Sequence, residues 1–451
     1  MSSIERLRRL GLFDARAPRY TSYPPANHFG ENVGPDTVAH WLQAVPSGAR
    51  VSLYLHIPYC RRLCWFCACR TQGTSTDRPL IPYLDQLRAE MAIVDANLPK
   101  DVVLSHVHLG GGTPTLLPPE MIRDLGRDIA AFRPWAEDCE FSVEIDPTEV
   151  DKPRIEALQE IGMNRASIGV QDFDPAVQEC IGRIQSFEQT RDVVEMLRDA
   201  GVNSLNMDIL YGLPHQDKGR MADSVQKVLS LAPDRVALYG YAHVPWMAKR
   251  QVMIPSDALP NAEERLHLFD TARRLFVWDG YREIGIDHYA REGDSMAEAD
   301  RSNTLRRNFQ GYTVDDSDLL IGLGASAISR YPQGFAQNHS TSSRYATAIA
   351  EGRLATVRGH AMSPEDLLRS DMIEMLMCRF ELDLDELSER HGIPVVELRE
   401  RVRHIPRDFP DHVEERGNRI RLTENARLVA RLVAAELDQY AMPEGRHSRA
   451  L

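Results

Sequence analysis

Long apolar runs are missing from this sequence of 451 residues. No stretch approaches the roughly 20 apolar residues that a membrane helix requires, and charged residues within the first nine positions stand where a signal peptide has its apolar core. We therefore expect no membrane span and a cytoplasmic location. A disulfide framework is missing too, because the seven cysteines are odd in number and four of them cluster. The sequence also contains no internal repeat and no low-complexity tract.

Positive charge is scarce, since 53 Lys and Arg residues face 66 Asp and Glu residues and leave a formal net charge of −13. This balance argues against a large phosphate-binding surface, so we expect no nucleic-acid partner. An anionic ligand would need a local cationic patch. Residues 1–50 offer one candidate, with six arginines against four acidic residues. The alternative is an ordinary solvated arm.

A cluster of cysteines, Cys60, Cys64 and Cys67, follows the strand-like run Ser52–Ile57 with the spacing C-x3-C-x2-C. Three thiolates in a short loop can converge on one metal centre. Zinc motifs usually come as two separated pairs, and no second pair occurs here. A four-iron cluster with three cysteine ligands and one open iron fits better, although four-thiolate ligation is commoner. Zinc remains an alternative, with Cys69 or a histidine as its fourth ligand.

Strand-like and helical patterns alternate from residue 50 onward, which predicts parallel β/α units and an α/β fold. Six units make a partial (β/α)6 barrel that stays open. The cysteine loop and the glycine run at 110–112 each follow a strand, so the chemistry is predicted at the strand carboxyl ends. The strand-like runs are Ser52–Ile57, Val107–Leu109, Glu140–Ile145, Arg165–Val170, Ser204–Leu210 and Val236–Tyr241. The helical patterns are Leu80–Leu98, Pro118–Phe132, Lys152–Ile161, Glu188–Ala200 and Arg220–Leu231.

The domain boundaries follow from changes in this pattern. We predict an N-terminal extension over 1–48 that contacts the substrate, the barrel with extra strands over 49–355, and a mainly helical C-terminal domain over 356–451. Tyr281–Tyr289 is expected to add one more strand to the barrel. The C-terminal domain begins with a capping serine at Ser363, includes a helical pattern over Glu381–His391, and a winged helix is one form that it could take. We interpret it as a lid or support, with an independent binding module as the alternative.

Two motifs together are typical of a known family. The C-x3-C-x2-C loop followed by Gly110-Gly-Gly-Thr-Pro114 resembles the radical S-adenosylmethionine (SAM) superfamily, in which the open iron of a [4Fe-4S] cluster binds SAM. The segment Arg19-Tyr-Thr-Ser-Tyr-Pro24 and the extra Cys69 narrow the resemblance to the oxygen-independent coproporphyrinogen III oxidases (coproporphyrinogen dehydrogenases) of haem biosynthesis. Ala68 and Arg70 depart from the Gly and Asn usual in that family, which puts fine contacts near the cofactor in doubt but not cluster ligation.

The resemblance implies a reaction and a cofactor set. A 5′-deoxyadenosyl radical made from SAM removes hydrogen from two propionate side chains of coproporphyrinogen III, and loss of CO2 leaves the vinyl groups of protoporphyrinogen IX. Two SAM molecules are expected. A tetrapyrrole substrate, a low-potential flavodoxin- or ferredoxin-like electron donor and a monomeric state complete the prediction.

The candidate site residues fall into four sets. The metal ligands are Cys60, Cys64 and Cys67. By the resemblance, the first SAM is held by Tyr54, Glu144, Gln171, Arg183 and Asp208. Phe66 is added because it lies beside the cluster, and Gly111, Gly112 and Thr113 because bare backbone permits close approach, with a tight turn as the alternative. The resemblance gives Phe309, Gln310 and Ile328 to a second SAM, although these residues could simply pack a strand edge. Cys69, Arg19 and Tyr20 are the candidates for a catalytic or substrate-contacting role.

Three rival functions stay open. A haem chaperone of the related branch usually lacks the last cysteine and the segment at 19–24, both of which are present here. A radical SAM methylase or cyclopropanase would share the cluster and both SAM sites. A zinc-stabilised structural protein is the third.

Overall fold

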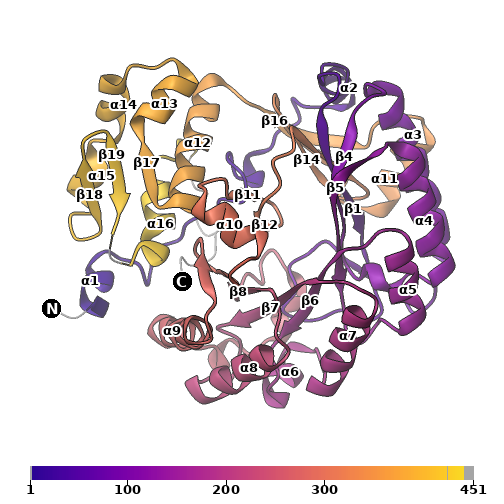
Figure 1. Ribbon diagram of the computed structural model, residues 1–451, viewed down its shortest axis with the longest axis horizontal. Coiled ribbons are helices and arrows are strands. Elements are labelled where there is room, and N and C mark those ends of the chain that lie inside the picture. The colour runs from indigo at the N-terminus through magenta and orange to yellow at the C-terminus, as the bar shows by residue number, and fades with distance from the viewer. Residues whose placement is uncertain (1–2, 424, 441–451) are drawn as a thin grey trace.

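The computed structural model describes residues 3–423 and 425–440. Residues 1–2 of the predicted N-terminal extension, together with residue 424 and residues 441–451 of the predicted C-terminal domain, lie outside the described residues. Figure 1 shows a large curved sheet with helices on its outer side, and a smaller, mainly helical part facing it.

The large sheet has twelve strands in the order β16-β15-β14-β13-β1-β4-β5-β6-β7-β8-β10-β9. The pairs from β13 and β1 through to β8 are parallel, and the sheet does not close. The predicted α/β fold with an open, partial barrel is therefore confirmed. Its parallel strands are β1 (Arg50–Ile57), β4 (Val103–Gly111), β5 (Trp135–Ile145), β6 (Arg165–Gln171), β7 (Ser204–Tyr211), β8 (Arg235–Gly240) and β13 (Leu319–Leu323).

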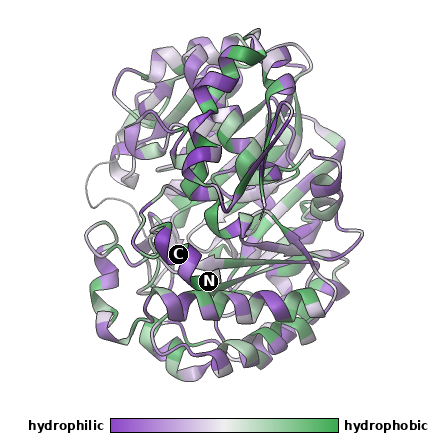
Figure 2. Ribbon diagram, turned by 90° about the vertical axis from the view of Figure 1, so that its left-hand side faces the viewer, coloured by the Kyte–Doolittle hydropathy of each residue, from purple (hydrophilic) through white to green (hydrophobic). Residues whose placement is uncertain are grey.

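Amphipathic helices cover the outer face of this sheet. On α4 (Pro119–Phe132), the buried residues Ile122, Leu125, Ile129 and Phe132 recur at intervals of three and four, as packing of one helical face requires. In Figure 2 the outer helices accordingly carry hydrophobic and hydrophilic residues together. The other covering helices are α3 (Leu80–Asn97), α5 (Lys152–Glu160), α6 (Pro175–Ile181), α7 (Phe187–Asp199), α8 (Lys218–Ser230) and α9 (Ala262–Trp278).

The two faces of the strands differ in chemistry. On β1, Val51, Leu53, Leu55 and Ile57 belong to the main hydrophobic core, and each buried aliphatic side chain of this size contributes about 1.5–3 kcal/mol. The alternate residues Ser52, Tyr54 and His56 point to the other face, which is concave. The interior of the barrel is therefore lined by polar groups that can meet a ligand.

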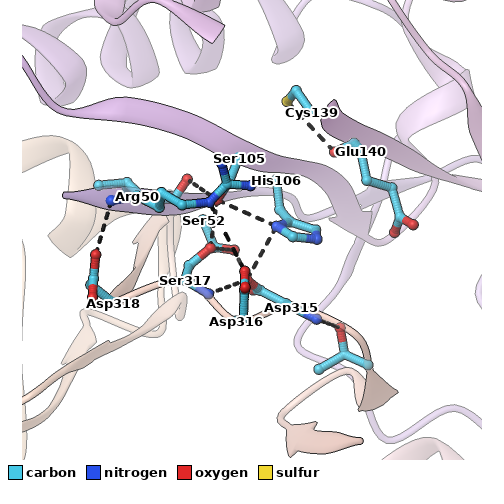
Figure 3. Close-up of polar contacts among 12 residues, drawn as sticks. Arg50, Ser52, Ser105, His106, Cys139, Glu140, Asp315, Asp316, Ser317 and Asp318 are labelled. Carbon is cyan, nitrogen blue, oxygen red and sulfur yellow. Dashed lines mark hydrogen bonds and ion pairs between the residues drawn. The ribbon is translucent and has the colours of Figure 1, made fainter. Parts of the chain in front are cut away.

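The base of the barrel is closed by a polar network around Asp315, in the segment before β13. Figure 3 shows its carboxylate between Ser52 of β1 and His106 of β4. The His106 Nδ1 atom lies 3.1 Å from Oδ1 of Asp315, and the Ser317 N–H donates to the same carboxylate oxygen at 2.9 Å. These contacts fix β13 against β1 at the end of the barrel opposite the cysteine loop.

The predicted single strand at Tyr281–Tyr289 is wrong. Two short antiparallel strands, β9 (Arg282–Ile284) and β10 (His288–Ala290), stand there instead. Gly285 has φ +51°, and a Cβ atom at this position would lie 2.0 Å from the ring of Tyr312. The chain therefore turns at position 285, which only a residue without a side chain can occupy.

The N-terminal arm packs against the C-terminal region in a second hydrophobic core. Leu7, Leu12, Tyr20 and Tyr23 are at most 5% exposed and pack with buried residues of α12 and α16. The arginines of the arm are mostly exposed, so their role as an anion-binding patch stays a prediction. The predicted helix at Glu381–His391 begins three residues later, because Leu382 is buried in a strand that pairs with Ile420. The elements are α12 (Pro364–Arg379), β17 (Glu381–Asp383), α13 (Leu384–His391), α14 (Val395–Val402), α15 (His404–Asp408), β18 (Val413–Arg416), β19 (Arg419–Leu422) and α16 (Ala426–Ala435).

The remaining helices and strands connect the barrel to the C-terminal region or lie at their edges. Among the helices of residues 3–423 and 425–440, none has both the length and the apolar character needed to cross a bilayer. The connecting elements are α1 (Ser3–Arg9), α2 (Pro35–Gln43), β2 (Tyr59–Cys60), β3 (Gln72–Gly73), α10 (Ser295–Arg301), β11 (Arg306–Asn308), β12 (Gly311–Thr313), β14 (Ile328–Tyr331), β15 (Gly334–Asn338), α11 (Ser342–Ala350) and β16 (Thr356–Ala361).

Candidate functional site

The cysteine loop lies at the carboxyl end of β1, where the sequence predicts it. Cys60 and Cys64 are buried, Cys67 is half-buried and Cys69 is exposed. Cys69 turns back toward Cys67, and its backbone N–H donates to the Cys67 sulfur at 3.4 Å. Hydrogen bonds from Cys69 lower the pKa of Cys67 against the effect of burial, whereas burial raises the pKa of Cys60 to about 11.

Two contacts anchor this loop to the rest of the barrel. The Trp65 N–H donates to the Ile181 carbonyl oxygen at 2.9 Å, and the Trp65 ring covers Gly182, where a Cβ atom would lie 2.9 Å from it. Gly182 ends α6 in the left-handed region with φ +67°. The close packing and the backbone angle both require glycine at this position.

The glycine run packs directly against the cysteine loop. The Gly112 and Thr113 N–H groups donate to the carbonyl oxygens of Ile57 and Tyr59 at 2.8 and 2.9 Å. A Cβ atom on Gly112 would lie 2.5 Å from the Tyr59 oxygen, and one on Gly111 would lie 2.5 Å from the His56 ring. This packing is what the tight-turn interpretation requires, and contact of Gly111, Gly112 and Thr113 with SAM stays a prediction.

Arg183 is brought to the cysteine loop from the turn after α6. Its guanidinium donates to the Cys64 sulfur at 3.6 Å and to the Gly169 carbonyl oxygen at 2.9 Å, and it pairs with Asp146 at 3.2 Å. Burial lowers the pKa of Arg183, but Asp146 and Cys64 raise it by more, so the side chain stays charged. A buried cation next to a cysteine sulfur can bind an anionic group that approaches the same loop.

Gln171 ends β6 in a strained conformation. Its φ is +68°, in the left-handed region that non-glycine residues seldom adopt, and such outliers concentrate at functional sites. The register of β6 against β7 shifts at the same point. The bulge turns Gln171 toward Gly169, whose added Cβ atom would lie 3.2 Å from both Gln171 Nε2 and Arg183 Nη2. The structure thus brings together the predicted SAM residues Gln171 and Arg183.

Tyr54, Glu144 and Asp208 line the polar interior of the barrel. Glu144 accepts hydrogen bonds from the Gly111 N–H at 3.1 Å and from His108 at 3.4 Å. Desolvation raises the pKa of Glu144, but these two groups lower it by more, so its carboxylate is charged and can accept from an amine. Burial raises the pKa of Asp208, which accepts from Asn206 at 2.8 Å. The Tyr54 ring stacks on that of His108, with centroids 5.6 Å apart.

The residues predicted for a second SAM lie beside this interior. Gln310 is exposed and shares with Tyr54 and His108 a small cavity of about 30 Å³. Phe309 packs edge-on against Phe335, with centroids 5.8 Å apart. Ile328 begins β14 and packs closely on Gly322 of β13, which pairs with Tyr54 of β1. A Cβ atom on Gly322 would lie 2.5 Å from the Ile328 carbonyl oxygen. The geometry is compatible with a ligand site and also with strand-edge packing, so the second SAM stays a prediction.

The side chains of Arg19 and Tyr20 differ in their exposure to solvent. The exposed Arg19 guanidinium donates to the Gly240 carbonyl oxygen, at the carboxyl end of β8, at 2.7 Å. Tyr20 is 5% exposed and its hydroxyl donates to Asp438 at 3.1 Å. Arg19 therefore joins the arm to the barrel and Tyr20 joins it to the C-terminal region, and contact of either residue with substrate remains a prediction.

Sequence reasoning missed the segment 244–254, which lies over the cysteine loop. Gln251 is buried and donates to the Phe66 carbonyl oxygen at 2.7 Å, and Arg250 donates to the Cys69 carbonyl oxygen at 3.2 Å. No motif marks these residues, because the contact spans about 180 positions along the chain. His56 and His108 are part of the same polar lining, with hydrogen bonds to Tyr54 and to Glu144.

The donor set fits a cluster with thiolate ligands. Three cysteine sulfurs lie on one short loop at the strand ends, next to the Arg183 cation. Within residues 3–423 and 425–440, no group of three or more His, Cys, Asp and Glu side chains converges as the ligands of a single metal ion would. Ligation of an iron–sulfur cluster by Cys60, Cys64 and Cys67 stays a prediction.

Comparison with known proteins agrees with this chemistry. The family model described as "Radical SAM superfamily" matches residues 54–228, and a radical SAM domain implies a [4Fe-4S] cluster and SAM. The oxygen-independent coproporphyrinogen III oxidase of Paracoccus denitrificans is 55% identical and covers 100% of both chains. The protein of the same name from Pseudomonas aeruginosa is 37% identical, over 95% of this chain and 94% of the relative.

A solved structure gives the same result. Coproporphyrinogen III oxidase from Escherichia coli, described as a radical SAM enzyme, superposes with a TM-score of 0.90 at 33% identity, over 94% of this chain and 98% of that one. The chain belongs to the oxygen-independent coproporphyrinogen III oxidases, a family of radical SAM enzymes.

Proposed function

We propose that this protein decarboxylates two propionate side chains of coproporphyrinogen III without oxygen, giving the two vinyl groups of protoporphyrinogen IX in haem biosynthesis. The proposal rests on the 55% identity to the Paracoccus denitrificans relative along the full length of both chains. Each propionate gives one hydrogen atom from its β-carbon to a 5′-deoxyadenosyl radical, then releases CO2 and passes one electron to a one-electron acceptor. A low-potential flavodoxin- or ferredoxin-like protein supplies electrons, and the enzyme acts as a monomer in the cytoplasm.

The cofactors supply the radical chemistry. When bound, the cluster and SAM together generate the 5′-deoxyadenosyl radical that abstracts the hydrogen atom. Cys60, Cys64 and Cys67 would hold the cluster as thiolates. Since ligation requires deprotonated sulfur, the pKa of Cys67, already lowered by its hydrogen bonds from Cys69, favours the ligated form.

The protein orients SAM through charged and polar side chains. The Arg183 guanidinium, next to Cys64, is the group that would pair with the carboxylate of SAM. The charged carboxylate of Glu144 would accept hydrogen bonds from its amino group, while Tyr54, Gln171 and Asp208 complete the polar lining. Trp65 and Phe66, which are half-buried beside the loop, would shield a radical from water and so from side reactions.

Two features of the chain argue against the alternative function of a haem chaperone. Cys69 is present and hydrogen-bonded to Cys67, and the segment at 19–24 is folded into the second core through Tyr20 and Tyr23. By family resemblance, we assign Phe309, Gln310 and Ile328 to a second SAM.

Anaerobic turnover tests the proposed function. Cluster-reconstituted protein is reduced with dithionite and incubated with SAM and coproporphyrinogen III, and the products are identified by mass spectrometry. Loss of two carboxyl groups with matching 5′-deoxyadenosine is expected. If 5′-deoxyadenosine forms while the tetrapyrrole is unchanged, the cofactor assignment stands and the substrate assignment fails, which redirects attention to methylase, cyclopropanase or haem-binding functions.

A further inference from the structure

An exposed apolar surface lies immediately outside the cysteine loop. Ten large hydrophobic side chains are exposed in the described part of the chain, and four of them fall within eight residues. They are Trp246, Met247, Val252 and Met253, which are 53%, 60%, 69% and 56% exposed. A group of exposed hydrophobic side chains this dense is typical of an interaction surface rather than of random surface composition.

This segment is held rigidly on the loop. Its 3-10 helix, η3 (Lys249–Met253), contains Gln251, which is 1% exposed. The Gln251 amide N–H donates to the Phe66 carbonyl oxygen of the cysteine loop at 2.7 Å, and its amide oxygen accepts from the Val244 N–H at 2.6 Å. Arg250 also donates to the Thr71 hydroxyl at 2.9 Å. The apolar side chains are therefore presented outward by a segment that is itself fixed to the cysteine loop.

Charge around this surface is opposite in sign to that of the whole protein. The cysteine loop and its continuation, residues 60–78, contain four arginines and one aspartate, and residues 243–259 contain one lysine, one arginine and one aspartate. The two segments together have an excess of four positive charges on a chain of net charge −13. Arg62, Arg70 and Lys249 are exposed. Within residues 3–423 and 425–440 none of them forms an ion pair with a carboxylate, although Glu149 lies close enough to Arg62 for the two charges to interact.

We propose that the surface formed by Trp246, Met247, Val252 and Met253, with the cations Arg62, Arg70 and Lys249 around it, docks an acidic, low-potential redox protein that reduces the cluster. The inference rests on the proposed function, because it assumes that a cluster is bound at Cys60, Cys64 and Cys67. In the step it serves, the reduced donor gives up one electron and the cluster gains it. No other bond or proton transfer is needed.

The position of the surface favours this partner over the other occupants. Cys69 is exposed, and the Arg250 side chain joins the apolar segment to its carbonyl oxygen, so a protein bound here approaches the cluster by the shortest route through the loop. An apolar centre with a cationic rim matches the contact face of a small acidic protein, in which steering by charge accelerates encounter. The tetrapyrrole, by contrast, must reach the concave interior on the other side of the loop.

Two matched pairs of variants test the inference. Val252→Asp removes an apolar contact and Lys249→Glu reverses a charge on the proposed surface. The controls are Val277→Asp and Arg274→Glu on the last turns of α9, where the side chains are exposed as well. Binding of an oxidised bacterial flavodoxin is measured by titration calorimetry with each protein, before cluster reconstitution and at two ionic strengths.

The expected result is a roughly tenfold weaker binding of flavodoxin for each surface variant and unchanged binding for both controls. Binding by the unchanged protein should weaken at the higher ionic strength. After reconstitution, the surface variants should need more flavodoxin to cleave SAM but should cleave it at the unchanged rate with dithionite.

Two outcomes would overturn the inference. One is equal flavodoxin binding by surface variants, controls and unchanged protein, and the other is an altered requirement for coproporphyrinogen with the flavodoxin requirement unaffected. If the reconstituted protein cleaves no SAM with dithionite, the proposed function fails, while the calorimetric comparison still decides whether the surface docks the flavodoxin.

Discussion

Substitution of Gly112 by alanine tests whether the glycine run holds the cysteine loop in place. Its Cβ atom would lie 2.5 Å from the Tyr59 carbonyl oxygen and 2.8 Å from that of Ile57. Both are backbone atoms of the segment that leads into Cys60, so a side chain cannot rotate away from them. An ordinary contact begins near 3.4 Å, and the two loops must therefore separate by about 0.9 Å.

That separation breaks the connection between the loops. The hydrogen bond from the Thr113 N–H to the Tyr59 oxygen, now 2.9 Å, would lengthen to about 3.8 Å, and the one from the Gly112 N–H to Ile57 would weaken with it. Each backbone hydrogen bond has a net value of about 1 kcal/mol, so the loop loses about 2 kcal/mol of local stabilisation. We expect a clear reduction in cluster incorporation while the protein stays folded.

The assay is the iron and sulfide content after anaerobic reconstitution, with circular dichroism to verify folding. Gly34→Ala is the matched control, because nothing lies within 4 Å of a Cβ atom at that position and its φ of −120° is accessible to alanine. Gly112→Ala protein with a full cluster content and unchanged turnover would refute the reasoning.

Three further predictions concern the cofactor, the substrate and stability. Arg183→Lys keeps the charge but not the planar guanidinium, so SAM binding measured by equilibrium dialysis should fall about tenfold with cluster content unchanged; equal SAM affinity would remove Arg183 from the site. Arg19→Ala should lower turnover of coproporphyrinogen III and leave the cluster intact, and unchanged kinetics would exclude Arg19 as a substrate contact. Burial raises the pKa of Glu90 from 4.5 to about 7, so this carboxyl favours the folded state most below pH 4.5 and loses about 3 kcal/mol of stabilisation as the pH rises to 7. Glu90→Gln should flatten that part of the stability profile in urea unfolding, and parallel profiles for the two proteins would contradict the assignment.

The sequence predicts most of the barrel because its strands and helices follow simple periodicities. The strand boundaries at Arg165 and Ser204 agree with the structure to the residue, since turns and helix caps delimit them on both sides. The hairpin at 282–290 could not be predicted, because the packing of the Tyr312 ring on Gly285 brings together residues that are distant in the sequence. β13 joins β1 in parallel after more than 250 intervening residues, and no local pattern specifies such a pairing.

The candidate site also has parts that the sequence predicts and parts that it does not. The cysteine loop and the glycine run are local motifs, so their proximity follows from neighbouring parallel strands. The contacts of Gln251 with Phe66 and of Asp315 with His106 depend on side chains that meet only in three dimensions. The packing of the arm at residues 4–23 could not be predicted, because its apolar residues are buried only by α12 and α16, which lie far away in the sequence.

Hydrogen transfer from the propionate is the most direct test of the proposed function. Coproporphyrinogen III labelled with deuterium at the β-carbons of its propionates is incubated anaerobically with the reconstituted, reduced protein and SAM, and 5′-deoxyadenosine is examined by mass spectrometry. The account predicts deuterium in the 5′-deoxyadenosine, in step with the formation of vinyl groups. Vinyl formation with unlabelled 5′-deoxyadenosine would contradict it.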